Sequence, residues 1–251
     1  DNQLIAFDNS RRRHLEIKRL GGLDEAGRGC LAGPGVAACV VFDSGAPLPG
    51  LNDSKKLTST QRESLVEPIL EHAKSWGLGF ATNSEIDRIN ILQATLLASH
   101  RAMRSLKPAP EFLLTDYLKP RGCNYPLESL VKGDNRSQVI AAASVLAKVA
   151  RDHIMIALDK IYPDYGFSRH KGYGTKEHRE TLHLHGPSKL HRVSFAGVGF
   201  FDLPVEKGLL NSNPLTHKPV NRLNKHHWMR ILSNSGLDLD PTELIPLIST
   251  R

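Results

Sequence analysis

Residues 20–34 read Leu20-Gly-Gly-Leu-Asp-Glu-Ala-Gly-Arg-Gly-Cys-Leu-Ala-Gly-Pro34, a short apolar run followed by two adjacent carboxylates and several glycines. Adjacent residues of a strand point to opposite faces of the sheet, so Asp24 and Glu25 cannot share one face of a regular strand. We therefore expect a site that uses both where the strand ends and the backbone becomes irregular. Glycines at 27, 29 and 33 permit this, because glycine tolerates positive φ. The alternative is a solvated turn that carries acids and a base.

The segments that follow predict strands alternating with helices. Apolar runs predict strands over 20–25, 35–43, 76–81 and 111–116. Periodicity and capping residues predict a helix opened by Thr58 and kinked or shortened at Pro68, a short helix capped by Asn83 or Ser84, a longer one capped by Asn90, and helices over 136–161 and 175–184. Residues 1–19 read as an amphipathic or frayed leader. This alternation is typical of an α/β fold, with antiparallel pairing of the early strands before the α/β crossovers.

The chain is expected to form one main domain with a C-terminal extension. Residues 1–200 hold all the strongly patterned segments. Residues 201–251 carry scattered prolines and asparagines and one possible helix over 221–233. We expect this extension to be helical and to pack on the main domain or be appended to it.

The composition favours a globular protein of a reducing compartment, most simply the cytoplasm. The 251 residues are 40% apolar and 24% charged, and no apolar run is long enough to span a membrane. The N-terminal residues show no secretory signal. Three cysteines, Cys30, Cys39 and Cys123, form no even disulfide framework and match no zinc spacing. The net charge of +7 favours a polyanionic partner such as nucleic acid.

Two further acids lie at the ends of predicted elements. Asp116 ends a strand, and Asp134 precedes the longest predicted helix. Taken singly, Asp116 can be a turn residue, and Asp134 can be a helix N-terminal acid favoured by the helix dipole. Strands of one sheet bring their ends together, however, and four carboxylates that converge repel one another unless cations bind them. Oxygen-only ligands suit Mg²⁺ or Mn²⁺, and a pair of such ions serves phosphodiester cleavage.

Segments suited to phosphate and sugar contacts accompany these acids. The loop Asn52-Asp-Ser-Lys-Lys-Leu-Thr58 offers hydroxyl, amide and ammonium groups, unless it is only a solvated turn. Tyr173 lies between two glycines beside a lysine, where an exposed ring can stack on a sugar or base; otherwise it packs on the surface. His183, His185 and His191 lack partners for a zinc site, and we expect them to lie at the surface or to face nucleic acid.

Five blocks in fixed order resemble ribonuclease HII of the bacterial type. They are Asp24-Glu-Ala-Gly-Arg-Gly29 with Ala32-Gly-Pro34, Asp53-Ser-Lys55, Lys132-Gly-Asp134, Ala141-Ala-Ala-Ser-Val-Leu-Ala-Lys-Val-Ala-Arg-Asp152 and His170-Lys-Gly-Tyr-Gly-Thr175. The resemblance covers about residues 20–195. It implies an RNase H-like mixed sheet flanked by helices. It also implies metal-dependent cleavage of the RNA strand of RNA–DNA hybrids, and cleavage 5′ of ribonucleotides embedded in duplex DNA.

The resemblance also assigns roles to residues. It implies that Asp24, Glu25, Asp116 and Asp134 bind the metal ions. It implies that Gly27, Arg28 and Gly29 sense the ribose 2′-hydroxyl and that Tyr173 stacks on the sugar beyond the RNA-to-DNA junction. Arg28 and Lys55 are expected to position phosphate or substrate. Asp152, which is also family-like, is read as structural or as a residue that supports the site from behind its metal ligands.

The chain departs from the family pattern at two positions. Tyr117 follows Asp116 where the family usually has glycine, and Cys30 stands where proline is usual. Two rival functions remain: a non-catalytic module that binds hybrids, and an RNase H-like nuclease that acts on DNA junctions. We expect a monomer.

Overall fold

The computed structural model describes residues 2–43 and 45–199, and these form an α/β fold around one mixed sheet. The strands are β1 (Leu20–Ala26), β2 (Gly35–Phe42), β3 (Ser75–Ala81), β4 (Phe112–Asp116) and β5 (Leu127–Leu130). The α-helices are α1 (Asn2–Leu15), α2 (Ser59–His72), α3 (Asn83–Met103), α4 (Gln138–Asp159), α5 (Phe167–His170) and α6 (Lys176–His185), and the short 3₁₀ helices are η1 (Gly133–Asn135) and η2 (Pro163–Tyr165). The predicted fold class is confirmed.

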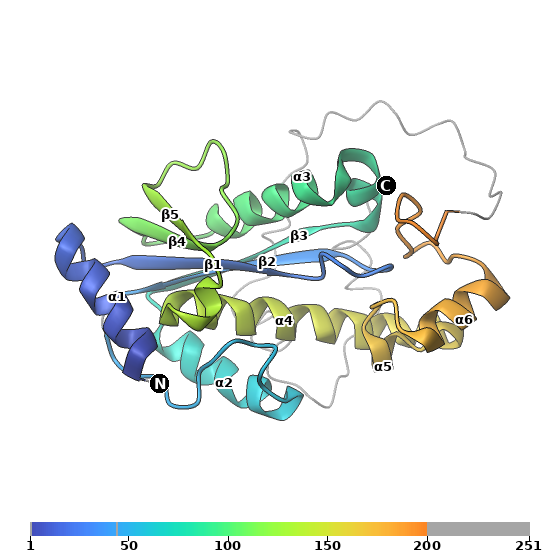
Figure 1. Cartoon of the computed structure of the whole chain (residues 1–251), viewed down its shortest axis with the longest axis horizontal. Helices are drawn as coiled ribbons and strands as arrows, with labels where there is room; N and C mark the ends of the chain where they lie inside the picture. The colour runs from blue at the N-terminus through green and yellow to red at the C-terminus, as the bar shows by residue number, and fades with distance from the viewer. Residues whose placement is uncertain (1, 44, 200–251) are drawn as a thin grey trace.

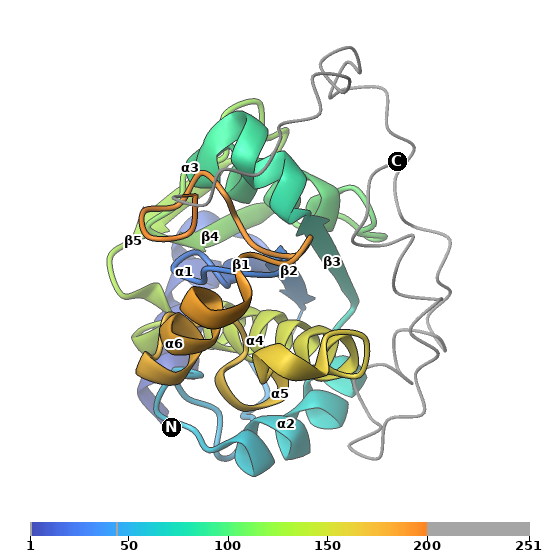
Figure 2. The same ribbon diagram turned by 90° about the vertical axis from the view of Figure 1, so that its right-hand side faces the viewer.

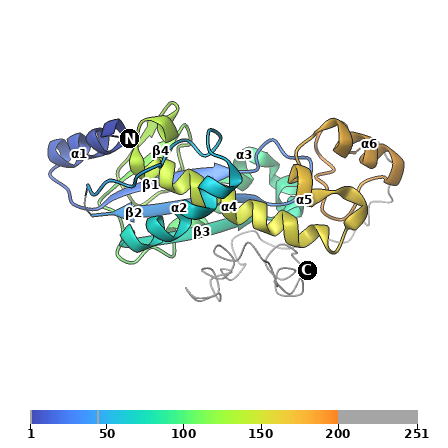
Figure 3. The same ribbon diagram turned by 90° about the horizontal axis from the view of Figure 1, so that it is seen from below.

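The sheet lies between two layers of helix. Its strand order is β3-β2-β1-β4-β5; β2 is antiparallel to both β1 and β3, whereas β1, β4 and β5 run parallel. The predicted order, antiparallel pairing before the crossovers, is therefore confirmed. Helix α3 covers one face, and α4 with α2 covers the other (Figures 1 and 2). Seen from below, α2 and α4 lie across the sheet (Figure 3).

Strand β1 and helix α4 form the centre of the molecule. Along β1, Leu20 packs into the apolar core under α4, and Leu23 packs into the core on the α3 side, as alternation requires. Helix α4 crosses β1 so closely that a Cβ on Gly22 would lie 2.2 Å from the backbone of Val139. Its alanines are fully buried, which permits the close approach. This close contact therefore fixes the position of α4 relative to β1.

Most predicted elements are present, and local chemistry explains the differences in their boundaries. Helix α2 has the expected capping box at Thr58 but runs past Pro68 to His72. Helix α3 is capped by Thr82, not by Asn83 or Ser84. The Thr82 hydroxyl accepts a hydrogen bond from Glu85 N, and the Glu85 carboxylate accepts one from Thr82 N, which makes a capping box. Asn90 interrupts α3 with φ 66° and ψ 165°, and its Oδ1 accepts from Gln93 N, as the predicted second cap should.

Besides α5 and the two short 3₁₀ helices, α1 and β5 were not predicted as such. Residues 2–15, expected to be an amphipathic or frayed leader, form helix α1, whose buried Asp8 accepts a hydrogen bond from Val139 N in the first turn of α4 at 3.0 Å. Strand β5 lies in a segment with no strong apolar pattern. Its four residues pair with β4 from Leu113↔Leu127 to Asp116↔Leu130.

Within the described residues, no helix is both long enough and apolar enough to cross a membrane. The described cysteines Cys30, Cys39 and Cys123 are all free thiols. The predicted extension over 201–251, with its possible helix over 221–233, lies outside the described residues.

Candidate active site

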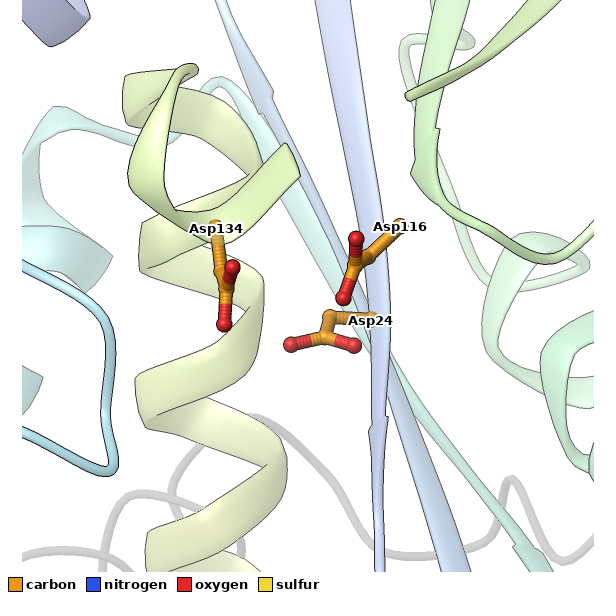
Figure 4. A group of neighbouring side chains, drawn as sticks. All are labelled: Asp24, Asp116 and Asp134. Atoms are coloured by element: carbon orange, nitrogen blue, oxygen red, sulfur yellow. The ribbon is translucent and has the colours of Figure 1, made fainter. Parts of the chain in front are cut away.

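Three acids from separate elements converge beside α4. Asp24 lies on β1, Asp116 ends β4, and Asp134 lies in η1 just before α4; one oxygen of each lies within 4.8 Å of the others (Figure 4). The parallel register explains the first pair: Leu23 pairs with Thr115, so the next residues, Asp24 and Asp116, come level on one face. Gly133 N donates to Asp116 Oδ1 at 2.7 Å, which holds η1 against the end of β4.

Glu25 lies beside this group without joining it. Both Asp24 and Glu25 belong to the regular part of β1, paired with Ala38 and Ala37 of β2. The backbone irregularity expected at these residues is therefore wrong, because the ladder with β2 continues to Ala26. Glu25 leaves the strand toward the opposite face, and its charge still raises the pKa of Asp24. Its Oε2 is buried and has no hydrogen-bond partner among the described residues.

The electrostatics of the cluster favour bound cations. Burial, and then the neighbouring Glu25 charge, raise the pKa of Asp24 well above its usual value. Burial also raises the pKa of Glu25 and, together with Asp53 and Asp116, that of Asp134. A carboxylate whose charge is this costly is stabilised by an opposite charge nearby. The oxygen-only donors and the unpaired Glu25 oxygen fit Mg²⁺ or Mn²⁺.

The loop that carries Lys55 borders the acids. Lys55 Nζ lies 3.8 Å from Asp134 Oδ2, while its side chain is 80% exposed. Burial lowers the pKa of Lys55, but Asp134, Asp53 and the other acids raise it more, so the net shift is upward. Lys55 N donates to Asp53 Oδ1 at 2.9 Å, which fixes the turn. The loop thus presents an ammonium group at the rim of the carboxylate cluster.

The Gly27-Arg28-Gly29 segment leaves β1 beside Glu25. Gly27 has φ 93°, and a Cβ there would lie 2.0 Å from Arg151 Nε, so the fold itself requires glycine. At Gly29 a Cβ would meet no atom within 4 Å, so packing in the described residues gives no reason for glycine there. Arg28 Nη1 lies 3.3 Å from Glu25 Oε1, and the Arg28 carbonyl accepts from Arg192 Nη1 at 3.0 Å.

Tyr173 is placed against the same segment. It bridges to Cys30 in an isolated antiparallel pair, and its ring is 38% exposed. Lys148 Nζ lies 5.0 Å from the ring centroid and Arg151 Cζ lies 5.7 Å from it. The ring therefore lies against two cations from α4 and is still partly exposed to solvent.

The histidines divide into two groups. His183 and His185 are exposed on α6, as expected. His191 is buried, so the expectation that it lies at the surface is wrong. Its Nε2 lies 3.0 Å from His178 Nε2, and burial lowers its pKa to about 3. His178 Nδ1 lies 2.9 Å from the Tyr173 carbonyl oxygen, so the pair of His178 and His191 holds the loop that carries Tyr173.

Several residues at the site were missed by sequence reasoning. Asn135 Nδ2 donates to Asp134 Oδ1 at 2.9 Å and to Asp53 Oδ2 at 3.1 Å, which joins two separate motifs. Ser144 hydrogen-bonds to Asp24 and lies 2.7 Å from Ser54 Oγ. The spacing of Ser144, Lys148 and Arg151 along one side of α4 was the available signal. Asp152, read as structural, lies 2.8 Å from Lys148 Nζ and 3.7 Å from Arg62 Nη2.

Comparison with known proteins identifies the family. The family model described as Ribonuclease HII matches residues 21–198. The chain is 54% identical to ribonuclease HII of Desulfitobacterium hafniense (strain DSM 10664 / DCB-2) over 71% of this chain and 69% of that protein. It is 51% identical to ribonuclease HII of Clostridioides difficile (strain 630) over 70% and 69%.

Solved structures show the same fold. The crystal structure of ribonuclease H2 from Pyrococcus horikoshii OT3 matches with a TM-score of 0.63 and 24% identity, covering 72% of this chain and 95% of that one. The chain therefore belongs to the ribonuclease HII family, metal-dependent hydrolases with ribonuclease H activity on RNA–DNA hybrids.

Proposed function

We propose that this protein is an endoribonuclease that cuts the RNA strand of RNA–DNA hybrids and also cuts 5′ of single ribonucleotides embedded in duplex DNA. The observation that carries the proposal is the group formed by the buried Asp24 and Asp134 and the half-buried Asp116 beside the unpaired Glu25 oxygen. We assign these four residues as ligands of two Mg²⁺ or Mn²⁺ ions. When bound, such ions supply water activation and stabilise the leaving oxygen in phosphodiester hydrolysis.

The surrounding residues would orient the substrate. Lys55, exposed at the rim of the cluster, is suited to hold a phosphate next to the scissile bond. The open backbone at Gly29 lets a ribose approach the Gly27–Gly29 segment, and the 2′-hydroxyl is the group that distinguishes RNA from DNA at one position. Arg28 is suited to contact the substrate there. Tyr173 offers a face for the next sugar, where a missing hydroxyl favours close stacking.

The test compares duplexes that differ by a single 2′-hydroxyl. Wild type with Mg²⁺ or Mn²⁺ should cut 5′ of the single ribonucleotide and leave the all-DNA duplex intact, and Asp24→Asn should cut neither. Gly29→Ala should keep the wild-type Tm and lose about ten-fold or more in cleavage, because a methyl group meets no protein atom but obstructs the ribose. Binding without cleavage would favour the non-catalytic module, and equal cleavage of both duplexes would favour a DNA nuclease.

We further propose that the enzyme acts as a monomer in the cytoplasm and that residues 201–251 are an extension of a catalytic domain formed by residues 1–200. The three free thiols support a reducing compartment. Sedimentation of the whole chain tests the first point, and a dimer would refute it. Cleavage by a chain truncated after residue 200 tests the domain division, which loss of folding would contradict.

A further inference from the structure

Tyr117 has a strained backbone conformation and an exposed ring, and neither of these stabilises the fold. It directly follows Asp116, has φ 56°, and its side chain is 71% exposed. The left-handed region is unfavourable for a bulky residue, and glycine adopts it without this cost. A ring that remains in water returns little hydrophobic stabilisation. Strained residues of this kind gather at sites that bind or react.

The backbone under the ring is fixed. Tyr117 N donates to Leu130 O at 2.8 Å, and Leu118 N donates to Asp116 O at 2.5 Å. The Thr115 hydroxyl donates to the Leu118 carbonyl, and His100 Nε2 lies 2.9 Å from the Arg121 carbonyl, which ties the following loop to α3. The ring of Tyr117 is thus presented from a turn that is already ordered beside the carboxylate cluster.

The ring borders a groove of about 840 Å³ between α3 and the β4–β5 end of the sheet. Leu92 and Val131, which are 47% and 64% exposed, supply apolar surface along it. Arg28, Lys119 and Arg121 also line it, and none of its described lining residues is acidic. Exposed apolar faces interleaved with cations, in a groove whose described lining holds no acid, are complementary to the sugars and phosphates of a nucleic acid.

We propose that Tyr117 is a second stacking platform for the substrate duplex, its ring against the sugar of a nucleotide whose flanking phosphates contact Lys119 and Arg121. This rests on the proposed function and extends its binding site. Tyr173 follows α5, whereas Tyr117 follows β4, and these two elements lie apart in the fold (Figure 1). Arg28 lines the groove as well, which connects it to the Gly27–Gly29 segment.

The first test measures duplex binding without divalent ions, so that cleavage plays no part. Tyr117→Gly should bind a hybrid or single-ribonucleotide duplex about ten-fold more weakly, in the lower half of the range for loss of one stacking contact. Tyr117→Phe should bind within two-fold of wild type. The Tm of Tyr117→Gly should equal or exceed that of wild type, because glycine relieves the strain. Leu184→Ala, which removes another exposed apolar side chain on α6, should bind as wild type.

The second test locates the phosphates. Duplexes are made with a neutral methylphosphonate linkage at each position of either strand in turn. At one or two positions this linkage should weaken binding by the wild type but leave binding by the double variant Lys119→Gln, Arg121→Gln unchanged. With Mn²⁺, Tyr117→Gly should raise KM and keep kcat and the Mn²⁺ dependence, which separates lost stacking from damage to Asp116.

Wild-type affinity in Tyr117→Gly, equal weakening in Tyr117→Phe, or methylphosphonate effects that persist in the double variant would each overturn the proposal. If wild type cuts neither a hybrid nor a single-ribonucleotide duplex, the proposed function fails, whereas the metal-free binding comparison still decides the role of Tyr117.

Discussion

The carboxylates of Asp24, Asp116 and Asp134 are brought together at a cost in free energy. Burial raises the pKa of Asp24 and of Asp134, so in the folded protein without cations their ionised forms are less favourable than in the unfolded chain. Stability from these groups is therefore highest at acidic pH and falls as pH rises toward neutrality. An ion that binds the folded state reverses this loss by mass action.

Asp134→Asn should separate the two effects. Without divalent ions at neutral pH, the variant should be as stable as wild type or more stable by roughly 1 kcal/mol, because one buried like charge is gone. With Mn²⁺, wild type should gain in Tm and the variant should gain much less and not cleave. Thermal unfolding with and without Mn²⁺ checks this, with Glu71→Gln on the exposed side of α2 as the control. An undiminished Mn²⁺ effect in Asp134→Asn would contradict the assignment.

At the level of single residues, acids could be predicted and their partners could not. Asp24, Asp116 and Asp134 each have an ordinary explanation alone, and they could be singled out only together, because one sheet brings the ends of its strands to one place. The regularity of β1 through Glu25 depends on the ladder with β2, which the sequence does not show. Asn135 joins Asp53 to Asp134 through an amide that looks like any loop asparagine.

Among the elements, helix α1 is the main difference from expectation. Its sequence is strongly basic and has a weak apolar stripe, so it reads as a leader. Tertiary contacts stabilise it: Asp8 accepts from Val139 N in the first turn of α4, where a carboxylate also complements the helix dipole. Strand β5 was missed for a related reason, since only its parallel pairing with β4 makes four residues a strand.

Asp8 should make stability depend on pH in a defined direction. Burial raises its pKa to about 6, and hydrogen bonds from Ser137 and Val139 lower it only partly. The folded protein therefore holds a proton that the unfolded chain releases above its ordinary pKa near 3.8. Stability from this group is present below pH 4 and is lost as pH rises through 6.

Asp8→Asn should remove that loss. The difference in unfolding free energy between Asp8→Asn and wild type should grow in favour of the variant by roughly 3 kcal/mol between pH 4 and pH 8, at 1.36 kcal/mol for each unit of pKa shift. Urea unfolding at a series of pH values measures it. Asp164→Asn, an exposed change in η2, should give a constant difference. A pH-independent difference for Asp8→Asn would show that Asp8 is ionised in the folded protein.

For the molecule as a whole, charge and layering were both readable from the sequence. The excess of 33 Lys and Arg over 26 Asp and Glu is the basis for expecting nucleic acid, and the alternation of strands and helices is the basis for expecting an α/β fold. The placement of the helices on particular faces required long-range pairing, above all the approach of α4 to Gly22.

Binding of an RNA–DNA hybrid should depend strongly on salt. Cations such as Lys55 and Lys119 replace counterions along the phosphate backbone, so the dissociation constant without divalent metal should rise at least about ten-fold between 50 and 200 mM salt. Fluorescence anisotropy over a salt series gives the slope. Lys119→Gln should reduce that slope by about one, whereas Lys74→Gln should leave it unchanged, because Lys74 directly precedes β3 and is paired with Asp43 after β2. A flat salt dependence would count against phosphate recognition.

Helix α4 runs past the carboxylates and then under Tyr173, so one helix sets the spacing between these two parts of the site. Ser144 hydrogen-bonds to Asp24, and Lys148, one turn later, lies under the Tyr173 ring. The four residues from Ser144 to Lys148 advance about 6 Å along the helix, and this spacing is fixed by its hydrogen bonds. In the proposed function, helix α4 thus fixes the separation between the scissile phosphate and the sugar that marks the junction. The position of the incision is then set by the pitch of a helix, and the sequence of the nucleic acid has no part in choosing it.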